Sequence, residues 1–200
     1  MKTHKFEDRE AWLEARRGKI TGSRLKDIVV KRGTGKKIGF YELIAERLGI
    51  PADDENSMDR GTRLESEAIE TFKKETGKKV DTSLVIWTRD DNENIAISPD
   101  GFIGKTEAVE AKCLASARHI EAFLTQQIPD EYEFQKLQYF IVNDKLKTLY
   151  FCFYDPRLIA KPFFYIAVNR ADIQEDIDTY LLYQKMTLEE VDSIVNSLTF

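Results

Sequence analysis

The sequence predicts one α/β domain in which helices flank a central mixed sheet of about five strands. Its 200 residues, 42% of them hydrophobic, suffice for a single domain with a core of its own. No Pro-, Gly- or Ser-rich stretch divides the chain, so we expect one domain over residues 1–200. Segments with helical spacing of apolar residues come before and after a group of short β-branched and aromatic segments. That order of elements is typical of a layered α/β architecture.

Helices come first along the chain. Apolar residues at helical spacing predict a helix over Glu7–Arg17. Thr21 and Ser23 are favourable cap residues for a second helix that runs to Val30. The basic, glycine-containing segment 31–37 predicts a flexible loop without the spacing of a P-loop. Two more helices are expected, over Phe40–Leu48 and Arg60–Thr76.

The strands follow, with further helices among and after them. Segments rich in β-branched and aromatic residues predict the strands Leu84–Arg89, Asn94–Ser98, Phe102–Gly104, Ala108–Cys113, Thr148–Tyr154 and Phe163–Val168. Helices are expected over Ser116–Gln126 and Asp130–Asn143, and two C-terminal helices close the domain. This order of elements suits a restriction-endonuclease-like core.

The segment 98–112 carries two carboxylates and an amine that the predicted strands bring together. Alternate side chains of a strand share a face, so Glu110 and Lys112 point the same way, and the apolar residues that alternate with them face the core. Asp100 lies in a Ser-Pro-Asp-Gly turn, and a tight bend there brings its carboxylate beside the neighbouring strand. The sequence therefore predicts that these three side chains converge.

Two converging carboxylates repel each other unless a hard divalent cation lies between them. Magnesium or manganese, as one or two ions, is the natural occupant. Such an ion lowers the pKa of a bound water and polarises a phosphoryl oxygen, and a nearby lysine steadies the developing charge. This combination is typical of phosphodiester hydrolysis. The alternative is a surface hairpin with an ordinary ion pair between Glu110 and Lys112, worth less than ~1 kcal/mol, and spacing alone does not choose between the two.

Six short motifs extend the pattern over nearly the whole chain. In order, they are Trp12 with Arg16, Gly18 and Ile20–Ser23; Gly61 with Glu65; Ser98–Gly101; Glu110–Cys113; Gln135–Tyr139; and Tyr154–Arg157. Together they resemble the lambda-type exonucleases, also called YqaJ-like viral recombinase nucleases. The resemblance implies a PD-(D/E)xK core, magnesium dependence, and digestion of one strand of linear duplex DNA from its 5′ end. The 3′ overhang left behind would serve phage-type recombination by single-strand annealing.

The resemblance also implies roles for single residues at the catalytic centre. Asp100, Glu110 and the backbone carbonyl of Ala111 would bind the metal, with Lys112 beside them as a catalytic residue. Glu65 would hold a metal-bound water, and the nearby Glu67 is the residue most easily confused with it.

A pocket for the 5′-phosphate is implied as well. Arg16 matches the phosphate-binding arginine, and a guanidinium can donate two parallel hydrogen bonds to a terminal phosphate. Ser23, Ser98 and Gln135 would complete the pocket. Taken singly, each serine is equally explained as a cap or turn residue and the glutamine as a surface helix residue. If Arg16 instead pairs with a glutamate, Arg17 is the next candidate.

The net charge of −5 is divided unevenly along the chain. Residues 1–50 hold 13 Lys and Arg against 7 Asp and Glu, whereas residues 51–100 hold 7 against 13. A basic segment beside an acidic, metal-binding one suits an enzyme that grips a phosphate backbone while cutting it, and segment 31–37 is a candidate DNA contact. Solvated helix faces explain the charge counts alone equally well.

Cysteine, histidine and hydropathy patterns argue against other classes. Cys113 and Cys152 lack C-x-x-C spacing and are predicted as buried thiols, and two cysteines are too few for an iron-sulfur cluster. The two histidines argue against a histidine-based metal site or triad, which leaves only a Cys113–His119 dyad open. No apolar run reaches the length of a membrane span. We therefore expect a cytoplasmic protein, in the host bacterial cytoplasm if it is phage-encoded.

The resemblance further implies a ring-shaped homotrimer that takes double-stranded DNA ends into a central channel, with a single-strand annealing protein as partner. Two other functions stay open. A PD-(D/E)xK endonuclease or RecB-like module would cut circular duplex, which an exonuclease leaves intact. A non-catalytic DNA-binding protein is the second, and the presence of Asp100, Glu110 and Lys112 argues against it.

Overall fold

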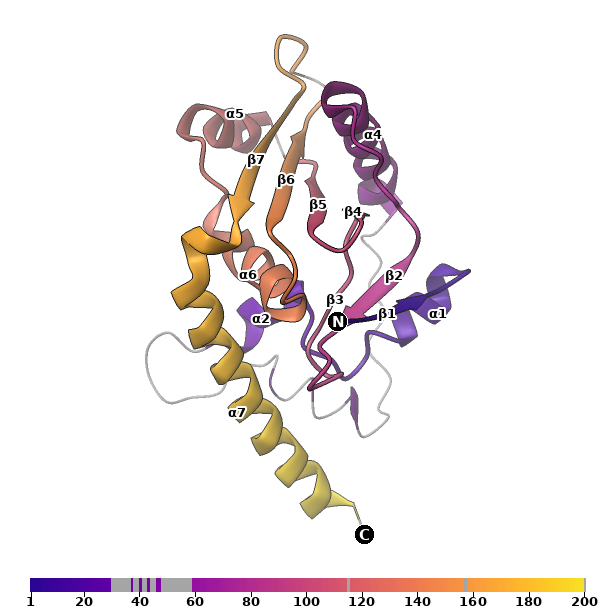
Figure 1. Cartoon of the computed structure of the whole chain (residues 1–200), viewed down its shortest axis with the longest axis vertical. Helices are drawn as coiled ribbons and strands as arrows, with labels where there is room; N and C mark the ends of the chain where they lie inside the picture. Colours follow the sequence, from indigo (N-terminus) through magenta and orange to yellow (C-terminus); the bar gives the residue numbers. More distant parts are fainter. Residues whose placement is uncertain are drawn as a thin grey trace.

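The computed structural model describes residues 1–29, 37, 40, 43, 46–47, 59–114, 116–156 and 158–199 (Figure 1). Its helices and strands are, in chain order, β1 (Lys2–Lys5), α1 (Arg9–Glu14), α2 (Gly22–Ile28), α4 (Asp59–Thr76), β2 (Val85–Thr88), β3 (Ala96–Ile97), β4 (Gly101–Ile103), β5 (Glu107–Lys112), α5 (Ser116–Thr125), the 3-10 helix η1 (Asp130–Tyr132), α6 (Glu133–Val142), β6 (Thr148–Tyr154), β7 (Phe163–Asn169), the 3-10 helix η2 (Arg170–Ile173) and α7 (Gln174–Leu198).

A four-stranded mixed sheet forms the centre of the fold, in the order β4-β5-β6-β7. β5 pairs antiparallel with β4 and parallel with β6, and β6 pairs antiparallel with β7. A second, antiparallel sheet in the order β1-β2-β3 lies beyond its β4 edge (Figure 1). The predicted α/β class with a mixed sheet between helices is confirmed, and the strands are divided between two sheets.

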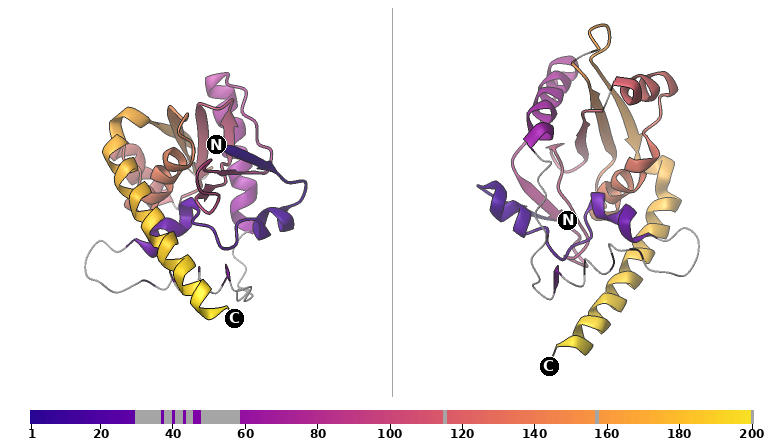
Figure 2. Two further views of the ribbon diagram at one scale, coloured as in Figure 1. Left: turned by 60° about the horizontal axis from the view of Figure 1, so that its bottom comes forward. Right: turned by 180° about the vertical axis from the view of Figure 1, so that it is seen from behind.

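Helices cover both faces of the four-stranded sheet (Figures 1 and 2). On one face, Phe72 of α4 packs with Val109 and Ala111 of β5 in a hydrophobic cluster. On the other face, Leu137 and other residues of α6 pack against Phe151 and its neighbours in the larger core. Because strand side chains alternate, Glu110 and Lys112 lie on the α6 face of β5, opposite Val109 and Ala111.

Most predicted elements form, with shifted ends. α1 covers only Arg9–Glu14 of the predicted helix, and the chain then turns at Gly18, whose φ is +66°. Thr21 occupies the N-cap position of α2, yet its side chain makes no capping hydrogen bond. α4 ends as predicted before Gly77, whose φ of +70° is the left-handed conformation that glycine allows.

Three differences stand out. β1 was not predicted, because all four of its residues are exposed and show no alternation; its pairing with β2 makes it a strand. The predicted helix Asp130–Asn143 is divided into η1 and α6. The prediction of two C-terminal helices is wrong: α7 is one helix of 25 residues after the short η2, and no Pro or Gly interrupts it.

Some predictions fall outside the described residues. Most of the predicted helix Phe40–Leu48, nearly all of the basic segment 31–37 and Arg157 lie there. None of the helices in the described ranges is long and apolar enough to cross a membrane.

Candidate active site

Asp100 reaches β5 from the turn before β4, as the sequence predicts. Its carboxylate accepts a hydrogen bond of 2.8 Å from the backbone N–H of Ala111. The next residue, Gly101, packs so tightly that an added Cβ would lie 2.5 Å from a methyl carbon of Val80. A glycine is therefore required at this turn, because any side chain would collide with Val80 in the core beneath α4.

Glu110 is the most enclosed carboxylate of the site, with 1% of its surface exposed. Three donors surround it. The side-chain amide of Gln135 donates to Oε1, the hydroxyl of Tyr139 donates to Oε2, and the ammonium of Lys112 lies 2.6 Å from Oε1. An ionised carboxylate is stable at such a depth because its oxygens are hydrogen-bonded. The exposed surface pair considered above is therefore wrong, although the shared face of Glu110 and Lys112 is confirmed.

The two carboxylates and the lysine perturb one another. Burial and, next, the charge of Glu110 hold the pKa of Asp100 well above its ordinary value. Burial by itself lowers the pKa of Lys112, but the carboxylates of Glu110 and Asp100 outweigh it and raise that pKa. Lys112 is therefore a cation at any physiological pH, and it serves as a donor of hydrogen bonds, not as a base.

Glu65 approaches the same centre from α4. Burial raises its pKa; among nearby charges, Lys112 opposes that rise and Glu110 adds to it. Its neighbour Glu67 instead accepts a hydrogen bond of 3.2 Å from the hydroxyl of Tyr154. Of these two glutamates, Glu65 is thus the one that lies in the field of the carboxylate pair.

The residues at this centre fit a hard divalent cation. Asp100 and Glu110 supply oxygen ligands, and their mutual repulsion is what a bound cation relieves. Within the described ranges, no three Asp, Glu, His or Cys side chains form a ready-made metal cluster. A cation held by the two carboxylates would therefore need backbone oxygen or water as further ligands. Magnesium accepts such mixed ligation, since it usually keeps several waters.

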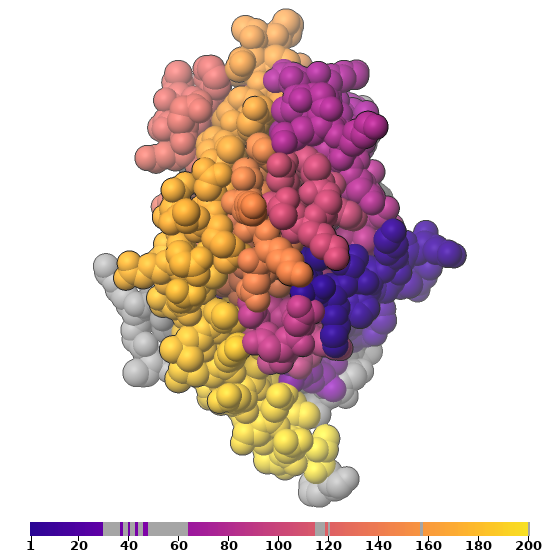
Figure 3. Space-filling view, in the orientation of Figure 1, coloured from indigo at the N-terminus to yellow at the C-terminus, as the bar shows by residue number. Residues whose placement is uncertain are grey.

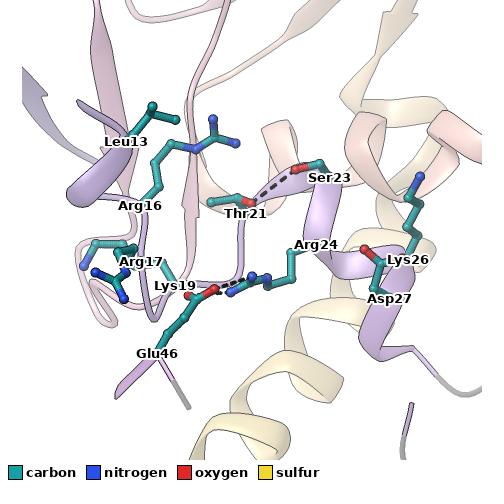
Figure 4. A pocket seen from close by; sticks show the side chains of 10 residues that line it. All are labelled: Leu13, Arg16, Arg17, Lys19, Thr21, Ser23, Arg24, Lys26, Asp27 and Glu46. Atoms are coloured by element: carbon teal, nitrogen blue, oxygen red, sulfur yellow. Dashed lines mark hydrogen bonds and ion pairs between the residues drawn. The ribbon is translucent and has the colours of Figure 1, made fainter. Parts of the chain in front are cut away.

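A cationic pocket of about 430 Å³ lies beside this centre, between the end of α1 and the start of α2 (Figure 4). Its charged lining residues are Arg16, Arg17, Lys19, Arg24, Lys26, Asp27 and Glu46. Arg24 is neutralised by Glu46 at 2.5 Å, and Arg17 pairs with Glu14 at 3.1 Å. With five cations against two carboxylates in its lining, the pocket has an excess of positive charge, which favours anions.

Arg16 is the cation of this pocket that reaches toward the carboxylates. Its guanidinium lies 4.5 Å from the centre of the Trp12 ring, and Figure 4 shows it pointing toward Thr21 and Ser23. Burial lowers its pKa, while Glu110 and Asp100 act in the opposite direction. The alternative assignment to Arg17 is not favoured, since Arg17 is the one that pairs with a glutamate.

Three segments meet at Gly22, next to Ser23. A Cβ there would lie 2.4 Å from Cδ1 of Ile97 and 3.0 Å from Cγ of Gln135, so α2 approaches β3 and α6 closely. Ser98 follows Ile97, and its buried hydroxyl has no hydrogen-bond partner within the described structure. Ser23 and Ser98 are the chain neighbours of Gly22 and Ile97, so the segments that carry Ser23, Ser98 and Gln135 adjoin one another here. The side-chain amide of Gln135 donates to Glu110, and the assignment of these three residues to a phosphate pocket stays a prediction.

Tyr139 is the contact that sequence reasoning missed. It lies four residues after Gln135 on α6, so the two side chains share a helix face and both reach Glu110. That four-residue spacing is the sequence feature that could have predicted the contact of Tyr139 with Glu110. Gln138, three residues after Gln135, instead turns into the core and donates to the carbonyls of Ile20 and Ala96 at 2.8 and 3.1 Å.

Cys113 and His119 do not have the features of a catalytic dyad. Burial and then the charge of Glu65 raise the pKa of Cys113 to about 12, so it stays a neutral thiol. His119 is buried, with Nε2 at 3.0 Å from the carbonyl of Lys161 and its ring against Phe164. Both Cys113 and Cys152 are free cysteines.

Comparisons with known proteins find solved structures that share this fold. A crystal structure of an alkaline exonuclease, LHK-Exo, from Laribacter hongkongensis matches 95% of the chain and 96% of its own, with 29% identity and a TM-score of 0.82. The same exonuclease in complex with dAMP matches equally well. A phage-related exonuclease from Haemophilus somnus 129PT shares the fold at a TM-score of 0.63 and 14% identity, over 90% of the chain and 96% of its own. No curated protein sequence matches the chain.

The family comparison covers two thirds of the sequence. The model of the YqaJ-like viral recombinase domain matches residues 11–145. Those residues include part of α1, all of α4 and α6, and the site residues Asp100, Glu110 and Lys112. Together with the LHK-Exo match, this family supports a nuclease of the exonuclease kind acting on DNA. The chain belongs to the family of proteins with a YqaJ-like viral recombinase domain.

Proposed function

We propose that this protein is a magnesium-dependent exonuclease that digests one strand of linear double-stranded DNA from the 5′ end and leaves a 3′ single-stranded overhang. The observation that carries the proposal is the juxtaposition of two unlike sites. A buried pair of carboxylates with a lysine lies beside a cationic pocket, and Gln135 and Arg16 connect the two. An anion fixed in the pocket places the next phosphate of the same strand near the carboxylates.

Each residue of the centre has a definite task in this proposal. Asp100, Glu110 and the carbonyl of Ala111 hold Mg²⁺, in one or two ions, with Mn²⁺ as a substitute. When bound, the ion acidifies water and polarises the scissile phosphoryl group. Glu65 orients the attacking water through a hydrogen bond; what supports this role is that its carboxylate is near enough to interact with the charges of Lys112 and Glu110. Lys112, which stays protonated, donates to the phosphate oxygen on which charge develops.

The cationic pocket determines polarity in this proposal. Arg16, Ser23 and Ser98 bind the terminal 5′-phosphate, and Gln135 lies at the border between that phosphate and Glu110. A terminal phosphate carries more charge than an internal one, so it is the better ligand for a guanidinium. Binding of the 5′-terminal phosphate, and not recognition of the base sequence, thus determines which phosphodiester bond is cut.

The proposal extends to the assembly and its surroundings. We infer a ring-shaped homotrimer whose channel takes a DNA end and releases one strand, which makes digestion processive. The 3′ overhang is passed to a single-strand annealing protein in phage-type recombination within the bacterial cytoplasm.

The test is digestion of linear duplex labelled at either the 5′ or the 3′ end, with a closed circular duplex as control, in magnesium and in chelator. Early release of the 5′ label as mononucleotide, an intact circle and no reaction in chelator are expected. Cut circles would replace the proposal with an endonuclease or RecB-like module. Absence of cleavage with both magnesium and manganese would leave a DNA-binding protein without catalysis.

A further inference from the structure

A second pocket borders the carboxylates on the other side of α1. It has a volume of about 300 Å³, and its walls include Arg9 and Trp12 of α1, Glu65 of α4, Leu84, Pro99 and Asp100. We call it the tryptophan pocket. Arg9 and Trp12 of α1 line this pocket, whereas Leu13 of α1 and Arg16, just beyond the helix, line the cationic one. The two pockets therefore lie on different sides of this segment; the tryptophan pocket includes Glu65 and Asp100 in its wall, and the cationic pocket is linked to the carboxylates through the charge of Arg16.

The charges of the two pockets are opposite. The tryptophan pocket has one cation, Arg9, against the three carboxylates of Glu65, Glu70 and Asp100. The cationic pocket has five cations against two carboxylates. A phosphate is attracted to the second and repelled by the first. The tryptophan pocket therefore suits an uncharged part of a nucleic acid.

Its apolar surface suits a base and a sugar. Leu84 lines the pocket and keeps 36% of its surface exposed. Trp12 is partly exposed, and its indole N–H donates to the carbonyl of Val85 at 3.2 Å, which fixes the ring in the wall. The guanidinium of Arg9 lies over this ring, 5.7 Å from its centre, so the ring, the planar guanidinium and the exposed leucine together offer a nucleobase flat and apolar contact without selecting its identity. The volume lies at the lower end of small-molecule pockets, enough for one nucleoside.

The position of the pocket defines which nucleoside enters it. Asp100 and Glu65 are both part of the wall, so the pocket begins where the reacting phosphate lies in the proposed function. The terminal nucleotide occupies the space between the cationic pocket and the carboxylates. The strand must then leave the reacting phosphate in another direction, and the tryptophan pocket is the hollow that adjoins Asp100 there.

We propose that the tryptophan pocket binds the deoxynucleoside immediately 3′ of the scissile phosphate, which is the second nucleoside of the strand being digested. The inference rests on the proposed function and adds a binding site to it. Occupancy of this pocket aligns the scissile phosphodiester with the carboxylates before each cut, and the same nucleoside becomes the terminal one after it.

The test uses 5′-phosphorylated duplexes in which a tetrahydrofuran abasic residue replaces the first or the second nucleoside of the digested strand. The kcat/KM of the first cleavage is measured for each duplex and for the intact one. An abasic second position should lower kcat/KM about tenfold, or ~1.4 kcal/mol, which lies within the range for a stacked base. An abasic first position should have the smaller effect.

Variants of a pocket residue then test whether the penalty of the abasic second position arises in the tryptophan pocket. Leu84→Ala should slow the intact duplex and reduce the penalty of the abasic second position, whereas Leu84→Met, which keeps apolar bulk, should restore both. Leu124→Ala, at an exposed leucine on α5, is the matched control and should change neither.

Three outcomes overturn the inference. In the first, the parent protein cuts the intact duplex and the duplex with an abasic second position at equal rates. In the second, Leu84→Ala slows both substrates by the same factor. Both outcomes leave the proposed function standing. In the third, the parent protein leaves even the intact duplex uncut, which overturns the proposed function and the inference with it.

Discussion

The two carboxylates of the centre are stabilised very differently, although they lie close together. Glu110 has donors on both oxygens, from Gln135, Tyr139 and Lys112. Asp100 accepts one amide hydrogen bond from Ala111, and burial beside Glu110 raises its pKa well above the ordinary 3.8. Without a cation, the charge of Asp100 is therefore a cost to the folded protein, as is typical of a residue kept for function.

The first prediction concerns stability and pH. In chelator, Asp100→Asn should raise the free energy of unfolding near neutral pH, because it removes a charge that the fold disfavours. A carboxyl whose pKa is higher in the folded than in the unfolded protein costs nothing below the unfolded value, here 3.8, because it is protonated in both states. The cost grows as pH rises from that value through the folded pKa. The gain should therefore disappear as pH falls toward that value. Urea unfolding over a series of pH values measures it.

Asp176→Asn, at an exposed aspartate of α7, is the control for this measurement and should show little pH-dependent difference from the parent. An Asp100→Asn protein less stable than the parent near neutral pH would contradict the prediction.

The second prediction concerns Arg16. Arg16→Ala should reduce the preference for 5′-phosphorylated over 5′-hydroxyl ends by roughly tenfold to a hundredfold, the worth of a charge-assisted hydrogen bond of about 1.5–3 kcal/mol. Processivity should fall more than the rate of the chemical step. The comparison of initial rates on the two kinds of end measures the effect.

Arg17→Ala removes a neighbouring cation that pairs with Glu14, and its effect should be smaller. A parent protein with equal rates on both ends would refute the phosphate pocket.

At the scale of elements, α6 is the part that organises the centre. One face of the helix sends Gln135 and Tyr139 to Glu110. Its C-terminal carbonyls are held by two arginines: Arg89 binds the carbonyl of Ile141, and Arg170 binds that of Phe140 at 2.6 Å. The C-terminal end of a helix carries partial negative charge, so the two cations also interact favourably with the helix dipole. The helix is thus fixed at one end so that the other presents its side chains accurately.

The third prediction follows for Arg170, which also binds the carbonyls of Asn143 and Leu146 at 2.7 and 2.8 Å. Arg170→Met keeps the apolar stem and removes three hydrogen bonds, so it should lower the free energy of unfolding by about 1–3 kcal/mol. It should also speed amide hydrogen exchange in α6, which hydrogen-exchange mass spectrometry measures. Lys145→Met, at an exposed cation nearby, is the control. Unchanged exchange in α6 would show that other contacts hold the helix.

Elements defined by local sequence patterns could be predicted, and elements that depend on long-range pairing could not. β6 has the predicted bounds because five of its seven residues are β-branched or aromatic and most are buried. β1 depends on pairing with β2 across 80 to 86 positions, which no local pattern reveals. The predicted break near the C-terminus does not occur, because Ile177, Leu188 and Val191 lie on one buried face of a continuous helix.

Over the whole molecule, the folded chain places the basic N-terminal residues close to the acidic residues of the carboxylate centre. Basic N-terminal residues line the cationic pocket, and one of them, Arg16, lies within the field of Asp100, in the turn before β4, and of Glu110 on β5. The convergence of Asp100, Glu110 and Lys112 was predictable because strand alternation and a Pro-Asp-Gly turn are local signals. The link through Gln135 and Tyr139 was not, since it depends on how α6 packs on the sheet.

The fourth prediction concerns assembly. α7 extends along one side of the molecule and beyond the sheets (Figures 1 and 3) and exposes 61% of both Leu182 and Met186, which lie one turn apart. Light scattering should give the mass of a trimer, three times 23.2 kDa. A monomer at the concentrations where DNA is digested processively would contradict the ring.

The central claim is that Asp100, Glu110 and Lys112 form a magnesium-dependent nuclease centre. The most direct measurement compares the parent protein with Asp100→Asn on 5′-labelled linear duplex in magnesium, with folding and DNA binding of both verified beforehand. The parent should release the label as mononucleotide, and Asp100→Asn should bind the duplex and release none. Magnesium-dependent cleavage that persists unchanged in Asp100→Asn would show that the catalytic centre lies elsewhere.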